Sequence, residues 1–208
     1  MSFELTQEEG EYLVRLARRA AETFLTKRQT MKVPADAPSK FREKCGVFVT
    51  INNVEGNRHQ LRGCIGIPYP TTMLAKAVIE SAISSSVQDP RFTPMTVDEL
   101  SQVVFEVSVL TPPEPVEVEK PQDYCSKIKV GRDGLIVERT YCKGLLLPQV
   151  PVELNWDEET FLCECCVKAG LQPDSWLLNG TKIYKFQAII FWETTPKGKI
   201  IRKEISKK

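Results

Sequence analysis

The sequence Cys45-Gly46-Val47-Phe48-Val49-Thr50-Ile51 is rich in β-branched and aromatic residues, which is typical of a β-strand. Residues 52–57 have the composition of a turn, and residues 58–67 predict a partner strand. A helix is predicted over residues 72–86 from its apolar spacing. Thr96 and Glu99 have the spacing of a capping box on a short helix, and an alternating strand is predicted over residues 103–111. The pattern therefore predicts a strand–strand–helix–strand unit built on a hairpin.

A second copy of this pattern follows later in the chain. Gly134-Leu135-Ile136-Val137-Glu138 resembles the segment 88 positions earlier, and Cys142-Lys143-Gly144-Leu145-Leu146-Leu147-Pro148 resembles the returning strand. A helix over residues 157–169 and a strand over residues 183–192 complete the second copy. Hairpins dominate both copies, so we predict an α+β fold with largely antiparallel sheets and helices packed on them.

Two alternatives explain the similarity between the copies. An internal duplication would make two interleaved subdomains, with halves at about residues 45–111 and 134–192, inside a single domain of 208 residues. Alternatively, two hairpin-plus-helix units resemble each other by chance. A segment with four prolines, residues 111–122, separates the copies and is predicted to be a linker, because proline breaks helices and central strands.

A helix is predicted before the first copy. Thr6 and Glu9 have the spacing of a capping box, and apolar residues follow at helical intervals up to about residue 28. The helix over residues 6–28 also carries several arginines on its other face, which we interpret as a solvated surface.

Charge and composition exclude several classes of protein. Lys and Arg total 28 against 27 Asp and Glu, so the net charge is +1, which makes a nucleic-acid-binding protein improbable. Hydrophobic residues make up 42% of the chain, which argues against disorder, and no apolar stretch is long enough to span a membrane. Seven cysteines without a secreted spacing pattern, and an acidic start without a signal core, predict a cytoplasmic protein with reduced thiols.

The most distinctive motif is Leu61-Arg62-Gly63-Cys64-Ile65-Gly66, followed by Asp89-Pro90-Arg91-Phe92-Thr93-Pro94. Together with Gly144-Leu145-Leu146-Leu147-Pro148-Gln149 and the helix from Phe161 to Leu171, these segments resemble the AMMECR-like family, in its archaeal or bacterial form. The resemblance covers about residues 13–192. It implies an α+β fold of two subdomains from an internal repeat and no settled activity. No cofactor is predicted. Similar chains are sometimes joined to a Memo-like domain, which implies a shared pathway. The expected partner is a protein or a small molecule, and a Memo-like protein is one candidate.

Chemistry at the motif depends on how the strand presents Arg62 and Cys64. On a regular strand the two side chains share a face, and a guanidinium beside a thiol favours the thiolate. The one histidine, His59, has the opposite parity from Cys64, so no Cys–His pair is predicted unless a bulge at Gly63 reverses that parity.

Five other residues complete the predicted site. Gly63 and Gly66 bring bare backbone close to a bound group, and their N–H groups are candidates for holding an oxyanion or a phosphate. Arg91 is a candidate second cation, and Asp89 a candidate acceptor or base. Gln149 is a further candidate to reach the same pocket.

Three interpretations of this cluster stay open. The first is a binding or adaptor module with a small anion-accepting pocket around Arg62 and Arg91. The second is an enzyme that uses Cys64 as a nucleophile on a small anionic or carbonyl substrate. The third is a purely structural role, in which Cys64 packs in the core and Asp89 and Arg91 brace a loop.

No metal site is predicted. In Cys163-Glu164-Cys165-Cys166, helical spacing places Cys165 and Cys166 on the core face, and no second pair of cysteines has ligand spacing. Gly131-Arg132-Asp133-Gly134 is interpreted as a turn between strands. The lysine-rich segment from residue 197 onward is interpreted as a frayed, solvated end.

Overall fold

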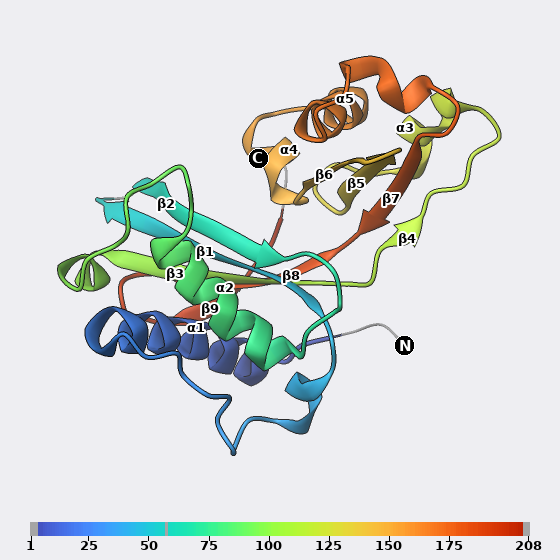
Figure 1. Cartoon of the computed structure of the whole chain (residues 1–208). Coiled ribbons are helices and arrows are strands. Elements are labelled where there is room, and N and C mark those ends of the chain that lie inside the picture. Colours follow the sequence, from blue (N-terminus) through green and yellow to red (C-terminus); the bar gives the residue numbers. More distant parts are fainter. Residues whose placement is uncertain (1–3, 57, 206–208) are drawn as a thin grey trace. The chain divides into compact units, whose positions relative to one another are not determined.

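Two units make up the chain in the computed structural model, which describes residues 4–56 and 58–205. The first unit runs to Leu110 and also includes Ile189–Lys203. The second unit contains Thr111–Ala188 and the residues from Glu204. Each unit has its own sheet and its own hydrophobic core (Figure 1). Antiparallel sheets with packed helices confirm the predicted α+β fold.

The first unit is built on a five-stranded sheet with the strand order β2-β1-β3-β8-β9. Strand β1 lies between β2 and β3 and pairs antiparallel with both. The strands are β1 (Gly46–Glu55), β2 (Arg58–Ile67), β3 (Val103–Leu110), β8 (Ala188–Glu193) and β9 (Ile200–Lys203). The hairpin of β1 and β2 confirms the prediction from the opening sequence pattern, although β1 extends through most of the predicted turn. The last residue of that turn, Asn57, lies outside the described residues.

Two helices cover one face of this sheet. Helix α1 (Gln7–Lys27) begins at the predicted capping box, since the Thr6 hydroxyl accepts from the Glu9 amide and the Glu9 carboxylate accepts from the Thr6 amide. Helix α2 (Leu74–Val87) packs on β1 and β2, while α1 packs on β3 and β9 (Figure 1). Two short 3-10 helices, η1 (Ser39–Arg42) and η2 (Asp98–Ser101), complete the unit.

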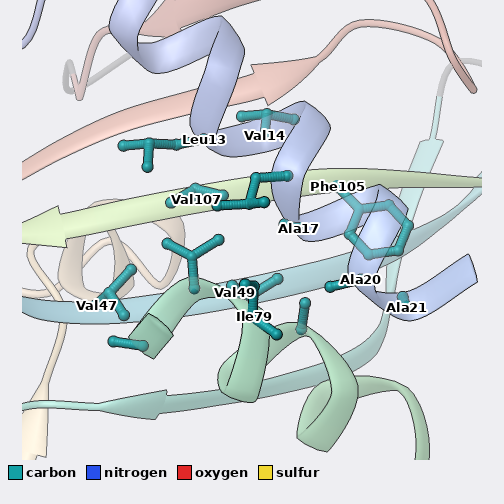
Figure 2. Packing of buried hydrophobic residues seen from close by; sticks show 14 of the residues in the cluster. Leu13, Val14, Ala17, Ala20, Ala21, Val47, Val49, Ile79, Phe105 and Val107 are labelled. Carbon is teal, nitrogen blue, oxygen red and sulfur yellow. The ribbon is translucent and has the colours of Figure 1, made fainter. Parts of the chain in front are cut away.

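The core of the first unit lies between the helices and the sheet. Alternate residues of β1 and β3 point toward the helices and are fully buried, because side chains of a strand alternate between its two faces. Small residues on α1 allow the helix to approach the sheet closely (Figure 2). The residues at this contact include Ala17, Ala20, Ala21, Val47, Val49, Ile79, Phe105 and Val107.

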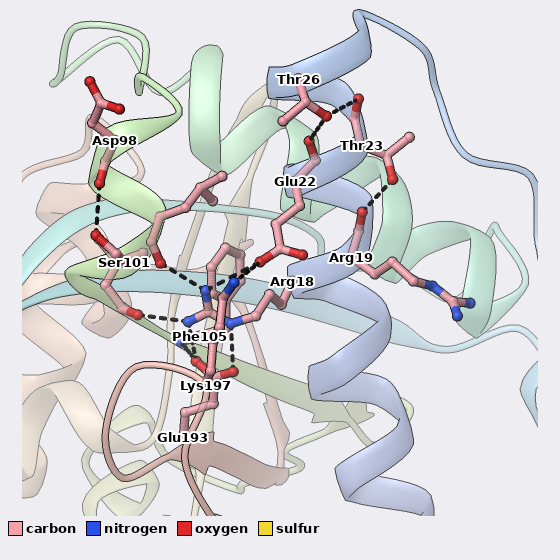
Figure 3. Close-up of polar contacts among 12 residues, drawn as sticks. Arg18, Arg19, Glu22, Thr23, Thr26, Asp98, Ser101, Phe105, Glu193 and Lys197 are labelled. Carbon is pink, nitrogen blue, oxygen red and sulfur yellow. Dashed lines mark hydrogen bonds and ion pairs between the residues drawn. The ribbon is translucent and has the colours of Figure 1, made fainter.

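A buried ion pair joins α1 to β8, so the prediction that the arginines of this helix form a solvated surface is wrong for Arg18, which is 6% exposed. Arg18 donates from Nε and Nη2 to the two carboxylate oxygens of Glu193, at 2.7 and 2.5 Å (Figure 3). The same guanidinium donates to the carbonyl oxygens of Leu100 and Val103, and Glu193 accepts from the Phe105 amide at 3.0 Å. The pair therefore satisfies backbone groups of η2 and β3 as well as its own charges, which a buried ion pair requires.

The second unit is built on a four-stranded sheet with the strand order β4-β7-β5-β6. Its strands are β4 (Glu114–Pro115), β5 (Gly134–Arg139), β6 (Cys142–Leu146) and β7 (Lys182–Phe186). Its helices are α3 (Tyr124–Lys127), α4 (Gln149–Glu153) and α5 (Glu158–Lys168), with 3-10 helices η3 (Pro121–Asp123) and η4 (Pro173–Leu177). Helix α5 packs on β5 and β6, and Asp157 caps it by accepting from the Thr160 amide.

Both units contain the predicted strand–strand–helix–strand order. The order β2-β1-β3 in one sheet corresponds to β6-β5-β7 in the other, with antiparallel pairing in each case. Duplication as the origin of this likeness stays a prediction, as do the predicted boundaries of the two halves. The second unit begins at Thr111, where the linker was predicted, and Pro115 of that segment lies in the short edge strand β4.

Two predictions about the end of the chain are wrong. The single strand predicted over residues 183–192 is two strands, β7 and β8, which belong to different sheets. The predicted frayed end contains β9, which pairs with β8 and adds the buried Ile200 to the core of the first unit. Lys207 and Lys208 of that segment lie outside the described residues. Among the described residues, none of the helices is long and apolar enough to cross a membrane.

Candidate functional site

A β-bulge in β2 determines where the motif side chains point. Gly63 pairs with Ile51 and Leu61 pairs with Asn52, so Arg62 is an extra residue without a partner on β1. The expectation that Arg62 and Cys64 share a face of a regular strand is therefore wrong. Cys64 pairs with Thr50 on the face turned away from α1 and α2, whereas Arg62 turns toward η2.

The bulge also changes the parity of His59. His59 now lies on the same face as Cys64, as expected for a bulge at this point. However, its ring packs against Trp192, with the ring centroids 5.1 Å apart. Its partner on β1 is Val54, four residues from the Thr50 partner of Cys64, which corresponds to about 13 Å along a strand. Cys64 and His59 therefore do not form a catalytic pair.

The Arg62 side chain binds other groups of this protein. It is buried, and its Nε donates to Glu99 at 2.7 Å while its Nη2 donates to the Thr93 carbonyl oxygen at 2.9 Å. Burial alone would raise the pKa of Glu99, but hydrogen bonds from Arg62 and from Thr96 outweigh it and hold that pKa below its usual value. Glu99 was predicted as a capping residue, and it does accept from the Thr96 amide at 2.7 Å.

Asp89 seals the open edge of β2. Its carboxylate is buried and accepts from the Cys64 amide at 2.8 Å and from the Arg91 amide at 3.1 Å. The Arg91 guanidinium binds both carboxylate oxygens, at 2.9 and 2.7 Å, and donates to the Cys64 carbonyl oxygen at 3.3 Å. Hydrogen bonds from Arg91 outweigh burial and, with those from the two amides, lower the pKa of Asp89 to about 2. Asp89 and Arg91 thus satisfy the backbone N–H and C=O groups of Cys64 on the edge strand, which could otherwise pair with another strand.

Arg91 is the cation of the motif that reaches solvent. Its side chain is 52% exposed, while the side chain of its partner Asp89 is 2% exposed. The guanidinium carbon also lies 5.5 Å from the centre of the Phe92 ring, and that of Arg62 lies 5.9 Å from the same ring. Two arginines and two carboxylates, those of Asp89 and Glu99, balance in charge, so the site presents one oriented guanidinium rather than a basic patch.

The Cys64 thiol is not activated by its surroundings. It is half-buried and accepts from the Thr50 hydroxyl at 3.2 Å. Burial raises its pKa, and the opposing effects of the Thr50 hydrogen bond and the Arg91 charge are smaller. A thiol with a raised pKa is mostly protonated at neutral pH and is a poor nucleophile.

Comparison with known proteins agrees with the resemblance carried by this motif. The family model described as AMMECR1 matches residues 14–191. A protein of Thermofilum pendens is 54% identical over 205 residues, which cover 96% of each chain. Protein PH0010 of Pyrococcus horikoshii is 54% identical over 206 residues, 99% of this chain and 100% of that one. This chain belongs to the AMMECR1 family. The crystal structure of PH0010, titled an uncharacterized protein, has a TM-score of 0.93 at 54% identity and covers 97% of this chain and 100% of its own.

Close packing explains the motif glycines of this AMMECR1 chain. A Cβ at Gly63 would overlap the carbonyl oxygen of Ser85 on α2, and a Cβ at Gly66 would overlap the carbonyl oxygen of Val47. A Cβ at Gly144 in β6 would likewise overlap the carbonyl oxygen of Cys165 on α5. The predicted oxyanion role of Gly63 and Gly66 stays a prediction, and the amide of Cys64 between them donates to a carboxylate of the protein itself.

We expect Gly63→Ala to lower the free energy of unfolding by about 1–3 kcal/mol, because the new methyl group meets a helix carbonyl and not a flexible side chain. Urea denaturation of the full chain measures the change. Gly56→Ala is the contrasting variant: there a Cβ meets nothing within 4 Å, but the backbone has a φ of 60°, so its cost is conformational alone. A Gly63→Ala variant as stable as the wild type would contradict the packing argument.

The structure brings four predicted residues together in the first unit: Arg62, Cys64, Asp89 and Arg91. Gln149 belongs to the second unit, where it begins α4 and is buried. Thr50 and Ser85 were not predicted to belong to the site, although Ser85 accepts from the Ile65 amide and donates to the Val49 carbonyl oxygen. Ser81 is also buried on α2, so no sequence signal singled out Ser85.

The cysteine-rich helix of the AMMECR1 chain contributes to its core, as predicted. Cys165 and Cys166 are fully buried in the second unit, and burial raises their pKa values to about 12 and about 11. Cys163 accepts from the indole N–H of Trp176 at 3.4 Å. Among residues 4–56 and 58–205, no three of the His, Cys, Asp and Glu side chains are placed to share a metal ion.

A turn is found at residues 131–132, but it joins α3 to β5, so the prediction of a hairpin turn between two strands is wrong. Gly131 has a φ of 84°, and Asp133 accepts from the Lys129 amide. Arg132 binds both carboxylate oxygens of Asp133, at 2.9 and 2.6 Å, and its side chain is 49% exposed. This pair has the same arrangement as Asp89 and Arg91 but is not next to a thiol, so it provides a matched control for experiments on the motif.

Proposed function

We propose that this protein is a noncatalytic binding module whose recognition point is Arg91 at the β2 edge. The observation that carries the proposal is an exposed guanidinium fixed in place by a buried carboxylate. Because Asp89 holds Nε and Nη2, the group is oriented before any partner arrives, which reduces the entropy lost on binding. Asp89 occupies the Nε–Nη2 edge of the guanidinium, so a carboxylate or phosphate oxygen would be bound by the donors of Nη1, for which no hydrogen bond is found among the described residues.

The ligand class follows from the charges around the motif. Arg62 is neutralised by Glu99, so only Arg91 offers a solvent-accessible positive group. A single cation partly neutralised by Asp89 favours a small anionic group, such as a carboxylate or a phosphate, over a polyanion. The half-buried Phe92 beside it adds an apolar contact, which suits an anionic group carried on an organic molecule or a partner protein.

We expect Arg91→Gln to weaken the binding of inorganic phosphate by about tenfold, since one charge-assisted contact is lost. The measurement is a phosphate titration of the isotope-labelled full chain by NMR at constant ionic strength, following the amides of Cys64, Arg91 and Phe92. Arg132→Gln is the matched control, because it removes an equally exposed and equally held arginine in the second unit. Equal affinities of the wild type and Arg91→Gln, or no saturable shift at the motif, would refute the proposal.

The second candidate function is thiol catalysis by Cys64, which the hydrogen bond from Thr50 and the nearby charge of Arg91 favour. For a thiol whose pKa is raised by burial, we expect iodoacetamide to modify Cys64 several-fold more slowly at pH 7 than a free model thiol. Mass spectrometry of peptides from the native chain measures the rate at each cysteine, and Cys64→Ser identifies the signal. Fast alkylation of Cys64 at pH 7 would instead support the enzyme.

A further inference from the structure

A small apolar hollow lies in the first unit beneath the connector between α1 and β1. Its volume is about 220 Å³. Val33, Pro34, Ala35, Ala37, Phe41 and Arg42 line it from the connector and η1, and Met73 and Ala75 line it from the start of α2. Seven of these eight residues are apolar, and Arg42 is the charged one. The anion binding proposed for Arg91 does not involve this hollow.

The walls of the hollow are held by backbone hydrogen bonds. The Phe41 amide donates to the Pro38 carbonyl oxygen, and the Leu74 amide donates to the Glu43 carbonyl oxygen, which fastens the connector to the start of α2. Lys40 pairs with Glu9 at 3.0 Å and so ties η1 to α1. A cavity with fixed walls binds a ligand without first having to be ordered.

Size and lining define the apolar part of the ligand. A dry apolar cavity of roughly 150 Å³ is large enough for benzene. A hollow of about 220 Å³ therefore has room for one ring and a short side arm, but not for a nucleotide or a longer lipid. The Phe41 side chain is fully buried and has no exposed surface, so the accessible apolar lining comes from the partly exposed Val33 and Pro34 and from Met73, which is 41% exposed and can adjust to the shape of a ligand.

Arg42 defines the polar part of the ligand. It is exposed, and within the part of the chain that the structure describes no hydrogen bond or ion pair is found for its guanidinium. The other basic residue of η1, Lys40, is engaged by Glu9. An unpaired guanidinium at the edge of an apolar hollow suits a carboxylate joined to an apolar body.

We propose that this hollow binds a small monocarboxylate with a single aromatic ring. The ring lies against Val33, Pro34 and Met73, and the carboxylate pairs with Arg42. This site is separate from the motif around Cys64 and holds whether or not Arg91 binds anions.

The test uses the full isotope-labelled chain and three probes that differ in charge: phenylacetate, benzyl alcohol and phenethylamine. We expect saturable NMR shifts of the amides of residues 33–42 and of Ala75, with dissociation constants on the order of a millimolar. Phenylacetate should bind about tenfold more tightly than benzyl alcohol, and phenethylamine most weakly, because only the acid pairs with Arg42. Equal binding of the three probes, or no saturable shift, would overturn the proposal.

Three variants test the contributions of Arg42 and of the apolar hollow separately. Arg42→Gln should remove the preference for phenylacetate and leave the binding of benzyl alcohol unchanged. Ala37→Phe, which fills the hollow from the connector, should abolish the binding of all three probes while the remaining amide spectrum shows a folded chain. Arg58→Gln removes an exposed arginine at the other end of β1 and should change nothing. Unaltered phenylacetate binding in a folded Ala37→Phe variant would contradict the proposal.

Discussion

Replacing Glu193 with Gln is expected to lower the free energy of unfolding by about 3–5 kcal/mol, the cost of removing one partner of a buried ion pair. Gln keeps the shape of the side chain, but its amide group turns a donor toward Arg18 or toward the Phe105 amide, which are donors themselves. The buried guanidinium then loses its direct counter-charge and keeps the more distant Glu22, whose carboxylate oxygen lies 3.9 Å from Nη1. Urea denaturation of the full chain, followed by circular dichroism, measures the loss.

A matched surface variant shows whether burial is the cause. Glu80→Gln removes one partner of the Lys76–Glu80 pair, whose side chains are 54% and 43% exposed, and should change stability by less than about 1 kcal/mol. Replacing both buried partners, as in Arg18→Met with Glu193→Leu, should not restore stability, because the carbonyls of Leu100 and Val103 would lose their donor. A loss below about 1 kcal/mol in Glu193→Gln would show that the pair contributes little.

Local sequence patterns predicted the elements of the first unit because those elements depend on short-range chemistry. The capping box at Thr6 and the β-branched and aromatic composition of β1 act over a few residues, and both elements are found as predicted. The partners of β8 and β9 could not be predicted, because their pairing depends on the core that α1 and β3 build far away in the sequence. Nothing in residues 183–192 marks Gln187 as the point where the chain passes from one sheet to the other.

The motif residues were found from the sequence, but their partners were not. The β-bulge depends on how Gly63 packs against α2, and alternation alone predicts a regular strand. Glu99 was predicted as a capping residue, yet it also binds Arg62 from 37 positions away. Long-range contacts between opposite charges follow from the fold and not from spacing. As a result, the two predicted cations differ: Arg62 belongs to a buried ion pair with Glu99, whereas the guanidinium of Arg91 is exposed.

The carboxylate of Asp89 is expected to make this protein lose stability in acid. Its pKa is about 2 in the folded chain, below the usual 3.8, so the charged form is favoured by folding. The sign follows directly: the contribution is fully present above about pH 4 and is lost as the pH falls from there toward 2. The difference between 3.8 and about 2 corresponds to about 2 kcal/mol, which is reasonable for a side chain that is 2% exposed.

Asp89→Asn should therefore cost about 2–3 kcal/mol at pH 7, and the difference from the wild type should shrink between pH 4 and pH 2.5. Urea denaturation at half-unit pH steps measures both curves, and subtracting them removes the titration of the other carboxylates. Arg91→Gln removes the largest cause of the low pKa but keeps the bond from the Cys64 amide, so it should move the loss to higher pH. A difference between wild type and Asp89→Asn that is constant from pH 7 to pH 2.5 would mean that Asp89 seals the β2 edge by shape alone and not by its charge.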